Sequence, residues 1–207
     1  MRLQMALDRM TLSDAISIIE QTKEHIDIIE IGTSLIKDYG LQSVRTIREK
    51  YPKAVILADI KTIDEAEYEF RAVYEAGADI ATVMGASALS TISICDSVAK
   101  EYRKEYMIDL LEADHDRLQR LTVFEDAIFE VHLPSDKKGE GLNDLVKKSM
   151  NTLQNVKRIA IAGGVTKSTL PFLRELGVEI IIVGGAITKA DDKEKAAKEF
   201  KKEGAHL

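Results

Sequence analysis

One stretch of the sequence, Ala54-Val55-Ile56-Leu57-Ala58-Asp59-Ile60-Lys61, indicates the architecture of the chain, because an unbroken apolar run leads directly into charged residues. Five apolar residues without polar alternation are typical of a strand that is buried on both faces, as in a parallel sheet covered by helices. Similar runs recur at fairly even intervals along the chain. The eight candidate strands are Leu3–Leu7, Ile26–Ile31, Ala54–Ala58, Ile80–Val83, Tyr106–Leu110, Ala127–Val131, Arg158–Ile161 and Glu179–Val183.

Amphipathic segments lie between these runs and carry apolar residues three to four positions apart, as in Ser13–Thr22, Leu41–Lys50 and Glu65–Ala76. This alternation predicts an α/β fold, a (β/α)8 TIM barrel, with residues 1–207 as a single domain. A doubly wound open sheet is the alternative. It usually has a glycine-rich first turn, whereas the first run here ends in Leu7-Asp8-Arg9-Met10. At this length the loops of a barrel must be short.

The composition fits an ordered globular protein, with 45% hydrophobic and 31% charged residues and only 3 prolines. A net charge of -6 without a long basic block argues against nucleic-acid binding. Asp8 and Arg9 interrupt any N-terminal apolar segment, and no run approaches membrane-spanning length, so we expect a cytoplasmic protein without membrane contact. The one cysteine, Cys95, lies in an expected helix and is interpreted as core packing.

Charged residues stand at the ends of the expected strands, which is where barrels of this type build their active sites. The carboxylate of Glu30 within an apolar run should be strongly disfavoured unless a cation or a hydrogen-bond donor satisfies it, so we expect a positive group to face it. The candidate site residues at strand ends are Asp8, Glu30, Asp59, Lys61, Asp109 and His132.

The segment Asp59-Ile60-Lys61-Thr62-Ile63-Asp64 is the most specific of these features. Residues two apart in a strand point to the same side, so Asp59 and Lys61 are expected to face the barrel axis together. Asp64 lies beyond the strand. Three alternatives are open for it: the same pocket, a neighbouring subunit, or the N-terminus of the next helix.

Glu30 and Asp59 on neighbouring strands supply hard oxygen ligands that suit Mg²⁺. A divalent ion there would stabilise an enediolate, with Lys61 adding a second positive charge. His132 would deliver or remove a proton near neutral pH, although a histidine at a strand end can also be structural. The other histidines, His25, His115 and His206, are assigned no role.

Two glycine pairs follow the last two expected strands, Gly163-Gly164 and Gly184-Gly185. Glycine lets backbone amides approach an anion closely, and a helix starting after each pair would add N-terminal amides. One pair alone is consistent with a tight turn. Two pairs at equivalent places predict a phosphate-binding site, because the loops after strands seven and eight are the usual phosphate cradle of this fold.

The same residues resemble the orotidine monophosphate decarboxylase superfamily, and within it 3-hexulose-6-phosphate synthase and 3-keto-L-gulonate-6-phosphate decarboxylase. The resemblance implies a homodimer with active sites at the subunit interface, Mg²⁺ held at Glu30 and Asp59, and Lys61 beside an enediolate. It implies that Asp64 acts in the partner's site, and that Asp8 and Thr33 bind a sugar phosphate. It covers nearly the whole chain and rests on Leu3–Asp8, Asp27–Thr33, Asp59–Asp64 and both glycine segments.

The middle of the chain favours the synthase over the decarboxylase. Thr82–Ser87 and Ile108–Leu110 are more similar to the synthase, whereas the decarboxylase typically has glutamate at the position of Asp109. The decarboxylase also favours arginine three residues after the histidine, where this chain has Ser135. We therefore expect an aldehyde-lyase that joins formaldehyde to ribulose 5-phosphate, or runs in reverse.

Two departures from the family pattern keep other hypotheses open. Glu65-Ala66-Glu67 replaces the usual Ala-Gly after Asp64, and Leu133-Pro134 replaces the small residues that usually follow the histidine. These changes allow altered specificity, including the decarboxylase activity, or a phosphate-binding barrel that has lost catalysis. A Schiff base on Lys61 is a further alternative, which the nearby carboxylates disfavour by holding the amine protonated.

Overall fold

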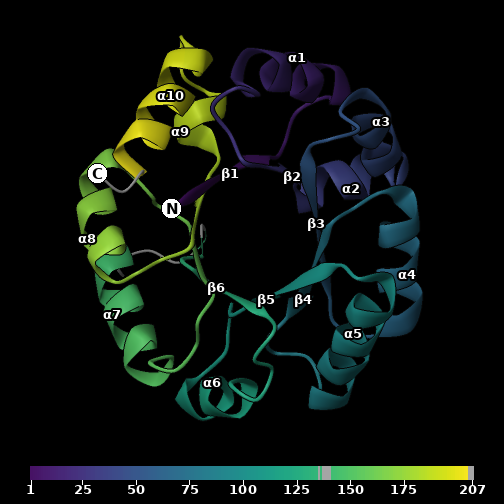
Figure 1. The fold of residues 1–207 in the computed structure, drawn as a ribbon, viewed down its shortest axis with the longest axis vertical. Coiled ribbons are helices and arrows are strands. Elements are labelled where there is room, and N and C mark those ends of the chain that lie inside the picture. Colours follow the sequence, from purple (N-terminus) through teal and green to yellow (C-terminus); the bar gives the residue numbers. More distant parts are fainter. Residues whose placement is uncertain (135, 137–140, 205–207) are drawn as a thin grey trace.

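The computed structural model describes residues 1–134, 136 and 141–204, and within them eight parallel strands close into a barrel surrounded by helices (Figure 1). The predicted (β/α)8 architecture is confirmed. Ser135 and His206 lie outside the described residues. The strands are β1 (Arg2–Leu7), β2 (Ile28–Ile31), β3 (Val55–Thr62), β4 (Ile80–Met84), β5 (Glu105–Asp109), β6 (Ile128–His132), β7 (Ile159–Ala162) and β8 (Ile180–Val183).

The helices begin and end close to the predicted positions, within one residue at each end for the three that the sequence pattern delimited. Thr11 caps the first of them by accepting a hydrogen bond from the amide of Asp14 at 3.1 Å. The helices are α1 (Leu12–Thr22), α2 (Thr33–Tyr39), α3 (Gln42–Lys50), α4 (Ala66–Ala76), α5 (Leu89–Tyr102), α6 (His115–Leu121), α7 (Leu142–Thr152), α8 (Leu170–Glu175), α9 (Gly185–Thr188) and α10 (Lys193–Gly204), with a 3-10 turn at Lys167–Thr169 before α8.

The interior of the barrel has two layers of different chemistry. Its lower layer is apolar, and on five consecutive strands the next residue on the same side is polar: Glu30, Asp59, Thr82, Asp109 and Glu130 follow two positions after apolar residues. We call the lower layer the apolar floor. It consists of Ile28, Leu57, Ile80, Met107, Ile128, Ala160 and Ile180, all of which are buried, while Ala162 and Ile182 of the same cluster line the cavity above it.

Strand β3 departs from regular geometry where its charged residues begin. The pairing with β4 shifts register between Ala58 and Thr62, and Lys61 has a φ of 48°. A non-glycine residue in this left-handed region is uncommon and marks local strain. The hydroxyl of Thr82 compensates by accepting a hydrogen bond from the amide of Lys61 at 2.8 Å. Regular alternation, from which the direction of Lys61 was predicted, therefore ends at this bulge.

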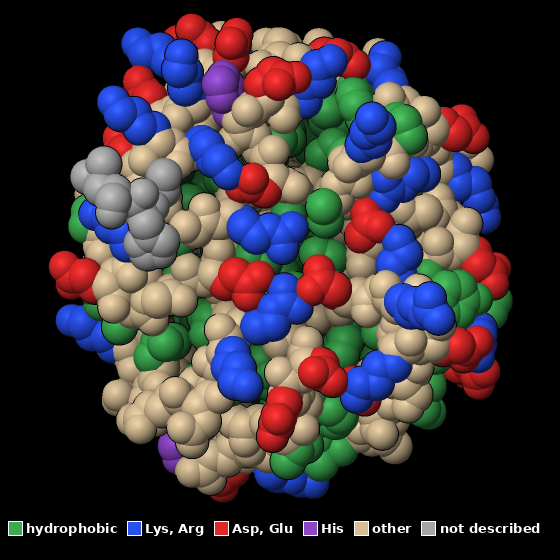
Figure 2. Space-filling model, viewed as in Figure 1, with side chains coloured by type: hydrophobic (Ala, Val, Ile, Leu, Met, Phe, Trp, Pro, Cys, Tyr) green, Lys and Arg blue, Asp and Glu red, His purple; other side chains and the backbone are tan. Residues whose placement is uncertain are grey.

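Acidic and basic side chains are interspersed over the centre of the face shown in Figure 2. At the beginnings of the strands, Arg158 forms a paired contact with Glu179, at 3.0 and 2.9 Å, and also pairs with Glu105. Asp79, just before β4, bonds both Arg48 and Lys104. These ion pairs tie the strand beginnings together. No helix within the described ranges combines the length and the apolar character needed to cross a bilayer.

Candidate active site

A cavity of about 840 Å³ opens at the carboxyl ends of the strands. It brings together most of the residues that the sequence singled out, although they come from six strands and their following loops. Its position agrees with the usual site of catalysis in this fold. The predicted residues in its lining are Asp8, Glu30, Thr33, Asp59, Lys61, His132, Gly163, Gly164, Gly184 and Gly185.

Two predicted residues are not part of this lining. Asp109 is completely buried at the end of β5, and the cavity reaches it only through Lys61 and His132, which it contacts. Asp64 is exposed on the loop after β3. The residue that caps α4 is Glu65, without a side-chain cap bond, so the interpretation of Asp64 as a helix cap is wrong.

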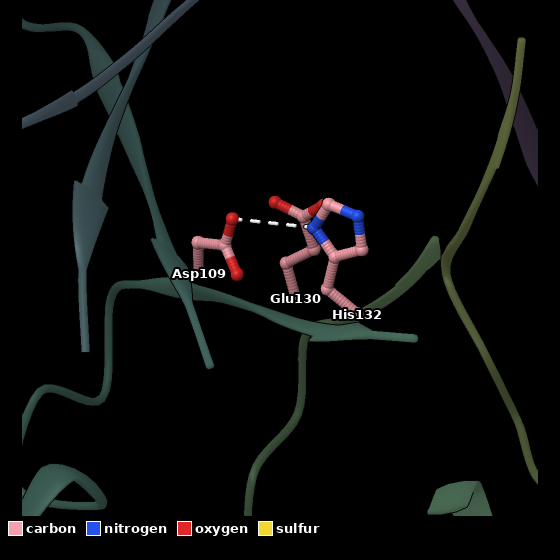
Figure 3. Close-up of side chains that lie close together, drawn as sticks. All are labelled: Asp109, Glu130 and His132. Atoms are coloured by element: carbon pink, nitrogen blue, oxygen red, sulfur yellow. Dashed lines mark hydrogen bonds and ion pairs between the residues drawn. The ribbon is translucent and has the colours of Figure 1, made fainter. Parts of the chain in front are cut away.

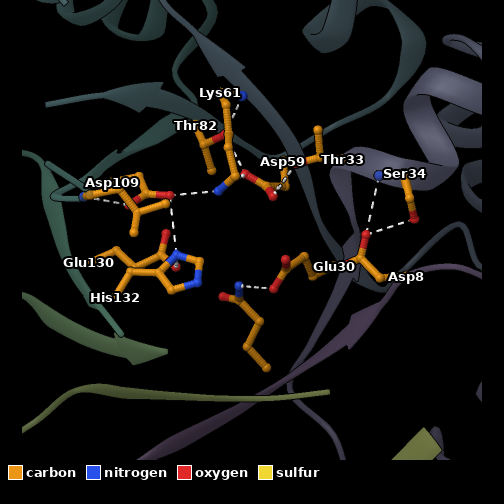
Figure 4. Close-up of polar contacts among 12 residues, drawn as sticks. Asp8, Glu30, Thr33, Ser34, Asp59, Lys61, Thr82, Asp109, Glu130 and His132 are labelled. Carbon is orange, nitrogen blue, oxygen red and sulfur yellow. Dashed lines mark hydrogen bonds and ion pairs between the residues drawn. The ribbon is translucent and has the colours of Figure 1, made fainter. Parts of the chain in front are cut away.

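Lys61 is the centre of the polar layer (Figure 4). Its ammonium lies 2.6 Å from Oδ2 of Asp109 and 3.2 Å from Oδ1 of Asp59. Burial opposes the charged amine, but the two carboxylates outweigh it and raise the pKa of Lys61 above its ordinary value. The lysine is therefore a fixed positive charge and a poor nucleophile, which argues against the Schiff-base alternative.

Asp59 is held from three sides. Thr33 donates a hydrogen bond to its Oδ2 at 2.6 Å, and Thr82 donates one to its Oδ1 at 2.8 Å, beside the Lys61 contact. On the neighbouring β1–β2 edge, Asp8 accepts bonds from the amide and hydroxyl of Ser34 at 3.2 and 2.8 Å. Both carboxylates are thus oriented before any substrate arrives.

Glu30 differs from Asp59 because no basic side chain of the described residues pairs with it. The amide of Gln4 donates a hydrogen bond to its Oε2 at 2.6 Å, so the structure supplies a donor where we expected a positive group. Burial, together with the charges of Asp59 and Glu130, raises the pKa of Glu30 well above its ordinary value. Glu30 is 7% exposed and lines the cavity, where a bound cation would stabilise its charge.

His132 completes the opposite side of the cavity (Figure 3). Its Nδ1 lies 3.3 Å from Oδ2 of Asp109 and 3.2 Å from Oε1 of Glu130. Burial opposes the imidazolium, but these contacts raise the pKa of His132 to about 10. For Asp109, burial is likewise outweighed, and hydrogen bonding to His132 and the charge of Lys61 lower its pKa.

Two groups of side chains in this layer offer possible metal ligands, and their surroundings distinguish them. Asp109, Glu130 and His132 place ligand atoms within 4.8 Å of one another, but Nδ1 faces both carboxylates and Lys61 already binds Asp109. That group is balanced by its own cations. Glu30 and Asp59 extend from adjacent strands and carry an excess of negative charge, so they fit a small divalent cation better.

The glycine loops form the remaining wall of the cavity. Gly163 and Gly164 both have positive φ, and a β-carbon at Gly163 would lie 2.2 Å from the carbonyl oxygen of Leu133. Only glycine fits there. A short helix begins within the second pair, as α9 spans Gly185–Thr188 with Gly184 as its cap. The expectation fails for the first pair, where a 3-10 turn at Lys167–Thr169 precedes α8.

Several cavity residues were not foreseen in the sequence. Glu130 stands two positions before His132 in β6, so the alternation argument used for β3 would have found it. Gln4 is uncharged and gave no signal. Arg9 and Lys37 add positive charge to the lining from the loop after β1 and from α2, at positions where basic residues are usually surface residues.

The family model described as "Orotidine 5'-phosphate decarboxylase / HUMPS family" matches residues 1–200. The chain is 36% identical to the 3-hexulose-6-phosphate synthase of Bacillus subtilis (strain 168), over 97% of each chain. It is 33% identical to that of Mycobacterium gastri, over 97% of this chain and 98% of the other.

Solved structures agree with these similarities. A crystal structure of 3-hexulose-6-phosphate synthase superposes with a TM-score of 0.91 at 34% identity, covering 99% of this chain and 100% of that one. The 3-keto-L-gulonate-6-phosphate decarboxylase of Vibrio cholerae gives a TM-score of 0.87 at 25% identity, covering 98% and 96%. The chain therefore shares its fold over nearly its whole length with a synthase and with a decarboxylase.

Proposed function

The chain belongs to the orotidine 5'-phosphate decarboxylase / HUMPS family and is a lyase, and from this premise we propose that it acts as a 3-hexulose-6-phosphate synthase. It would join ribulose 5-phosphate to formaldehyde through an enediolate, reversibly. The observation that carries this proposal is the ammonium of Lys61, fixed between Asp59 and Asp109 in a cavity that also holds Glu30 and a glycine cradle.

The substrate would lie across the cavity between the glycine loops and β1 to β3. Its phosphate would meet the backbone amides at Gly163-Gly164 and Gly184-Gly185, which line the cavity. Asp8, oriented by Ser34, accepts hydrogen bonds from sugar hydroxyls, and Thr33 contributes another polar contact. This placement puts the first carbons of the sugar beside Lys61.

Mg²⁺ would be held by Glu30 and Asp59, and when bound it polarises the carbonyl and hydroxyl oxygens of the substrate and so favours the enediolate. Lys61 contributes a permanent positive charge next to the same oxygens. Its two carboxylate contacts fix that charge in position, so little reorganisation accompanies the formation of the intermediate. His132 lies across the cavity and supplies or receives a proton at the reacting oxygen.

We also propose that the enzyme is a homodimer whose partner contributes Asp64. The carboxylate of Asp64 lies outside the cavity of its own subunit, on an exposed loop. Ile63 beside it is 56% exposed and Tyr68 on α4 is 74% exposed. Large exposed apolar side chains next to a charged residue are typical of an interface between subunits.

The test is turnover by the purified protein with ribulose 5-phosphate, formaldehyde and MgCl₂, followed as formaldehyde consumption and hexulose phosphate formation. We expect activity that EDTA abolishes and that added Mg²⁺ restores. Release of carbon dioxide from 3-keto-L-gulonate 6-phosphate instead would establish the decarboxylase. A thermal shift with ribulose 5-phosphate but no turnover of either substrate would identify a binding protein and reject the synthase.

A further inference from the structure

Glu130 is a buried carboxylate in the cavity wall that has no role in the reaction proposed above. It is 5% exposed and stands on the inner side of β6, between Ile128 of the apolar floor and His132 at the rim. Keeping an acidic side chain there is unfavourable unless it is paired. Its partner among the described residues is Nδ1 of His132.

The geometry around His132 indicates where its protons lie. Nδ1 faces one oxygen of Asp109 at 3.3 Å and one oxygen of Glu130 at 3.2 Å, and two acceptors are satisfied only if this nitrogen carries hydrogen. The other ring nitrogen, Nε2, is directed away from both carboxylates (Figure 3). Because His132 lines the cavity, Nε2 is the atom that a substrate meets.

Asp109 alone cannot fix the ring, because it serves other donors. Its Oδ2 also binds the ammonium of Lys61 at 2.6 Å, and its Oδ1 accepts the amide of Leu111 at 2.9 Å. Glu130 contributes the second carboxylate on the other side of Nδ1. The side chains of β3, β5 and β6 thus form a chain of alternating charge from Lys61 through Asp109 and His132 to Glu130 (Figure 4).

We propose that Glu130 is a positioning residue for His132, which keeps Nδ1 protonated and turns Nε2 toward the substrate as the proton donor. The orientation stands on the contacts above, while the reaction that uses it rests on the proposed synthase function. The enediolate electron pair forms the new carbon–carbon bond to formaldehyde. The carbonyl π electrons then take the Nε2 proton to form the hydroxyl. The proton that left C1 when the enediolate formed has passed to solvent, and solvent returns a proton to Nε2 to restore the imidazolium.

The charges that face this pair are consistent with a histidine that stays protonated. Asp109 on β5 and Glu130 on β6 contact His132 directly, while Lys61 on β3 acts through Asp109. Glu30 on β2 repels Glu130 from the opposite wall of the barrel. Burial and the charge of Asp109 raise the pKa of Glu130, while the contacts with Asp109 and Glu130 outweigh burial and raise the pKa of His132.

The first measurement uses the wild-type protein and needs no turnover. Two-dimensional ¹H–¹⁵N NMR of the histidine rings should show His132 doubly protonated at pH 8. The signals of His25 and His115 in the same spectrum serve for comparison. A ring of His132 that titrates near pH 6.5, or that lacks hydrogen on Nδ1, would overturn the proposal. If the ring behaves as expected but no hexulose phosphate is formed, the synthase assignment fails and the positioning role survives.

The second measurement compares Glu130→Gln with the control Glu105→Gln, which removes a carboxylate from the opposite end of the barrel. In E130Q we expect the pKa of His132 to fall by about 1 unit or more, because one of two neighbouring negative charges is lost. We expect kcat to fall by roughly 10- to 100-fold with KM for ribulose 5-phosphate nearly unchanged. The alkaline limb of the kcat profile should move to lower pH by the same amount.

E105Q should keep the wild-type titration of His132 and the wild-type pH profile, even if its thermal stability falls. An E130Q protein with the wild-type titration and profile would refute the positioning role. A parallel loss of kcat without any shift of the histidine titration would also refute it, because Glu130 would then act only on the structure.

Discussion

At the scale of single residues, Lys61 shows how strain and charge are combined. Its backbone has a positive φ, which is unfavourable for a lysine, and its ammonium is held by two buried carboxylates. Residues that keep such a conformation are concentrated at functional sites. The strain is compensated by the Thr82 hydroxyl, so the same local network sets the backbone of β3 and the direction of the charge.

Replacing Lys61 with alanine should reduce turnover by about 1000-fold or more while the barrel still folds, because the lysine stabilises charge that develops in the reaction. Turnover and far-UV circular dichroism of K61A would be measured beside Lys198→Ala, a change of an exposed lysine on α10. Activity of K61A within a few-fold of the control would contradict the role given to this ammonium.

Cys95 tests a prediction about packing rather than catalysis. It is completely buried in α5, as the sequence interpretation requires, and burial raises the pKa of its thiol to about 12. At pH 8 the native thiol therefore holds far less thiolate than an exposed one. We expect an aromatic disulfide reagent at pH 8 to label Cys95 only after urea unfolding. Rapid labelling of the native protein would show that the site is open.

Residues of the site divide into those that a sequence can reveal and those that it cannot. Charged residues directly after apolar runs, such as Asp59 and His132, are visible because their types contrast with their neighbours. Gln4 is invisible, since its role depends on facing Glu30 across two paired strands. The burial of Asp109 behind Lys61 is also a property of the assembled layer, which no linear pattern contains.

At the scale of elements, periodicity predicted the strands and helices well because each strand is buried on both faces and each helix on one. The prediction failed where local geometry departs from the regular period. The bulge extends β3 to Thr62, four residues beyond the end of the apolar run. The first glycine loop gives a 3-10 turn because Thr166 forms a capping box with Thr169 before the helix can begin.

The requirement for glycine at Gly163, in the loop after β7, can be tested directly by substitution. Gly163→Ala would place a β-carbon against the carbonyl of Leu133, whereas Gly177→Ala has a similar φ of 72° and nothing within 4 Å. The control should cost about 1–2 kcal/mol of unfolding free energy from its φ alone, and G163A distinctly more. Urea unfolding measures both.

G163A should also weaken the binding of ribulose 5-phosphate in calorimetry, while G177A should leave it unchanged, because only Gly163 lies in the cavity. Equal unfolding free energies and equal affinities in the two variants would mean that the approach of Leu133 to Gly163 has no consequence. The pair separates the steric contact from the backbone conformation that both glycines share.

At the scale of the whole molecule, the proposed sharing of active sites predicts complementation between inactive subunits. K61A and Asp64→Ala, each nearly inactive alone, should recover about a quarter of wild-type activity when refolded together, because half of the dimers are mixed and each has one intact site. The matched control is K61A mixed with Asp59→Asn, in which both changes fall in the same cavity and no recovery is expected. No recovery with Asp64→Ala, despite mixed dimers, would show that each subunit works alone.

The apolar floor lies between two charged regions of the barrel that serve different purposes, one for stability and one for catalysis. Its seven side chains separate the strand beginnings, with their ion pairs, from the acidic layer two residues above. We expect a substitution beneath that layer to change the free energy of unfolding without altering the electric field at the substrate. We therefore expect that substitutions which adapt the protein to heat or cold can be made at the strand beginnings without changing its chemistry.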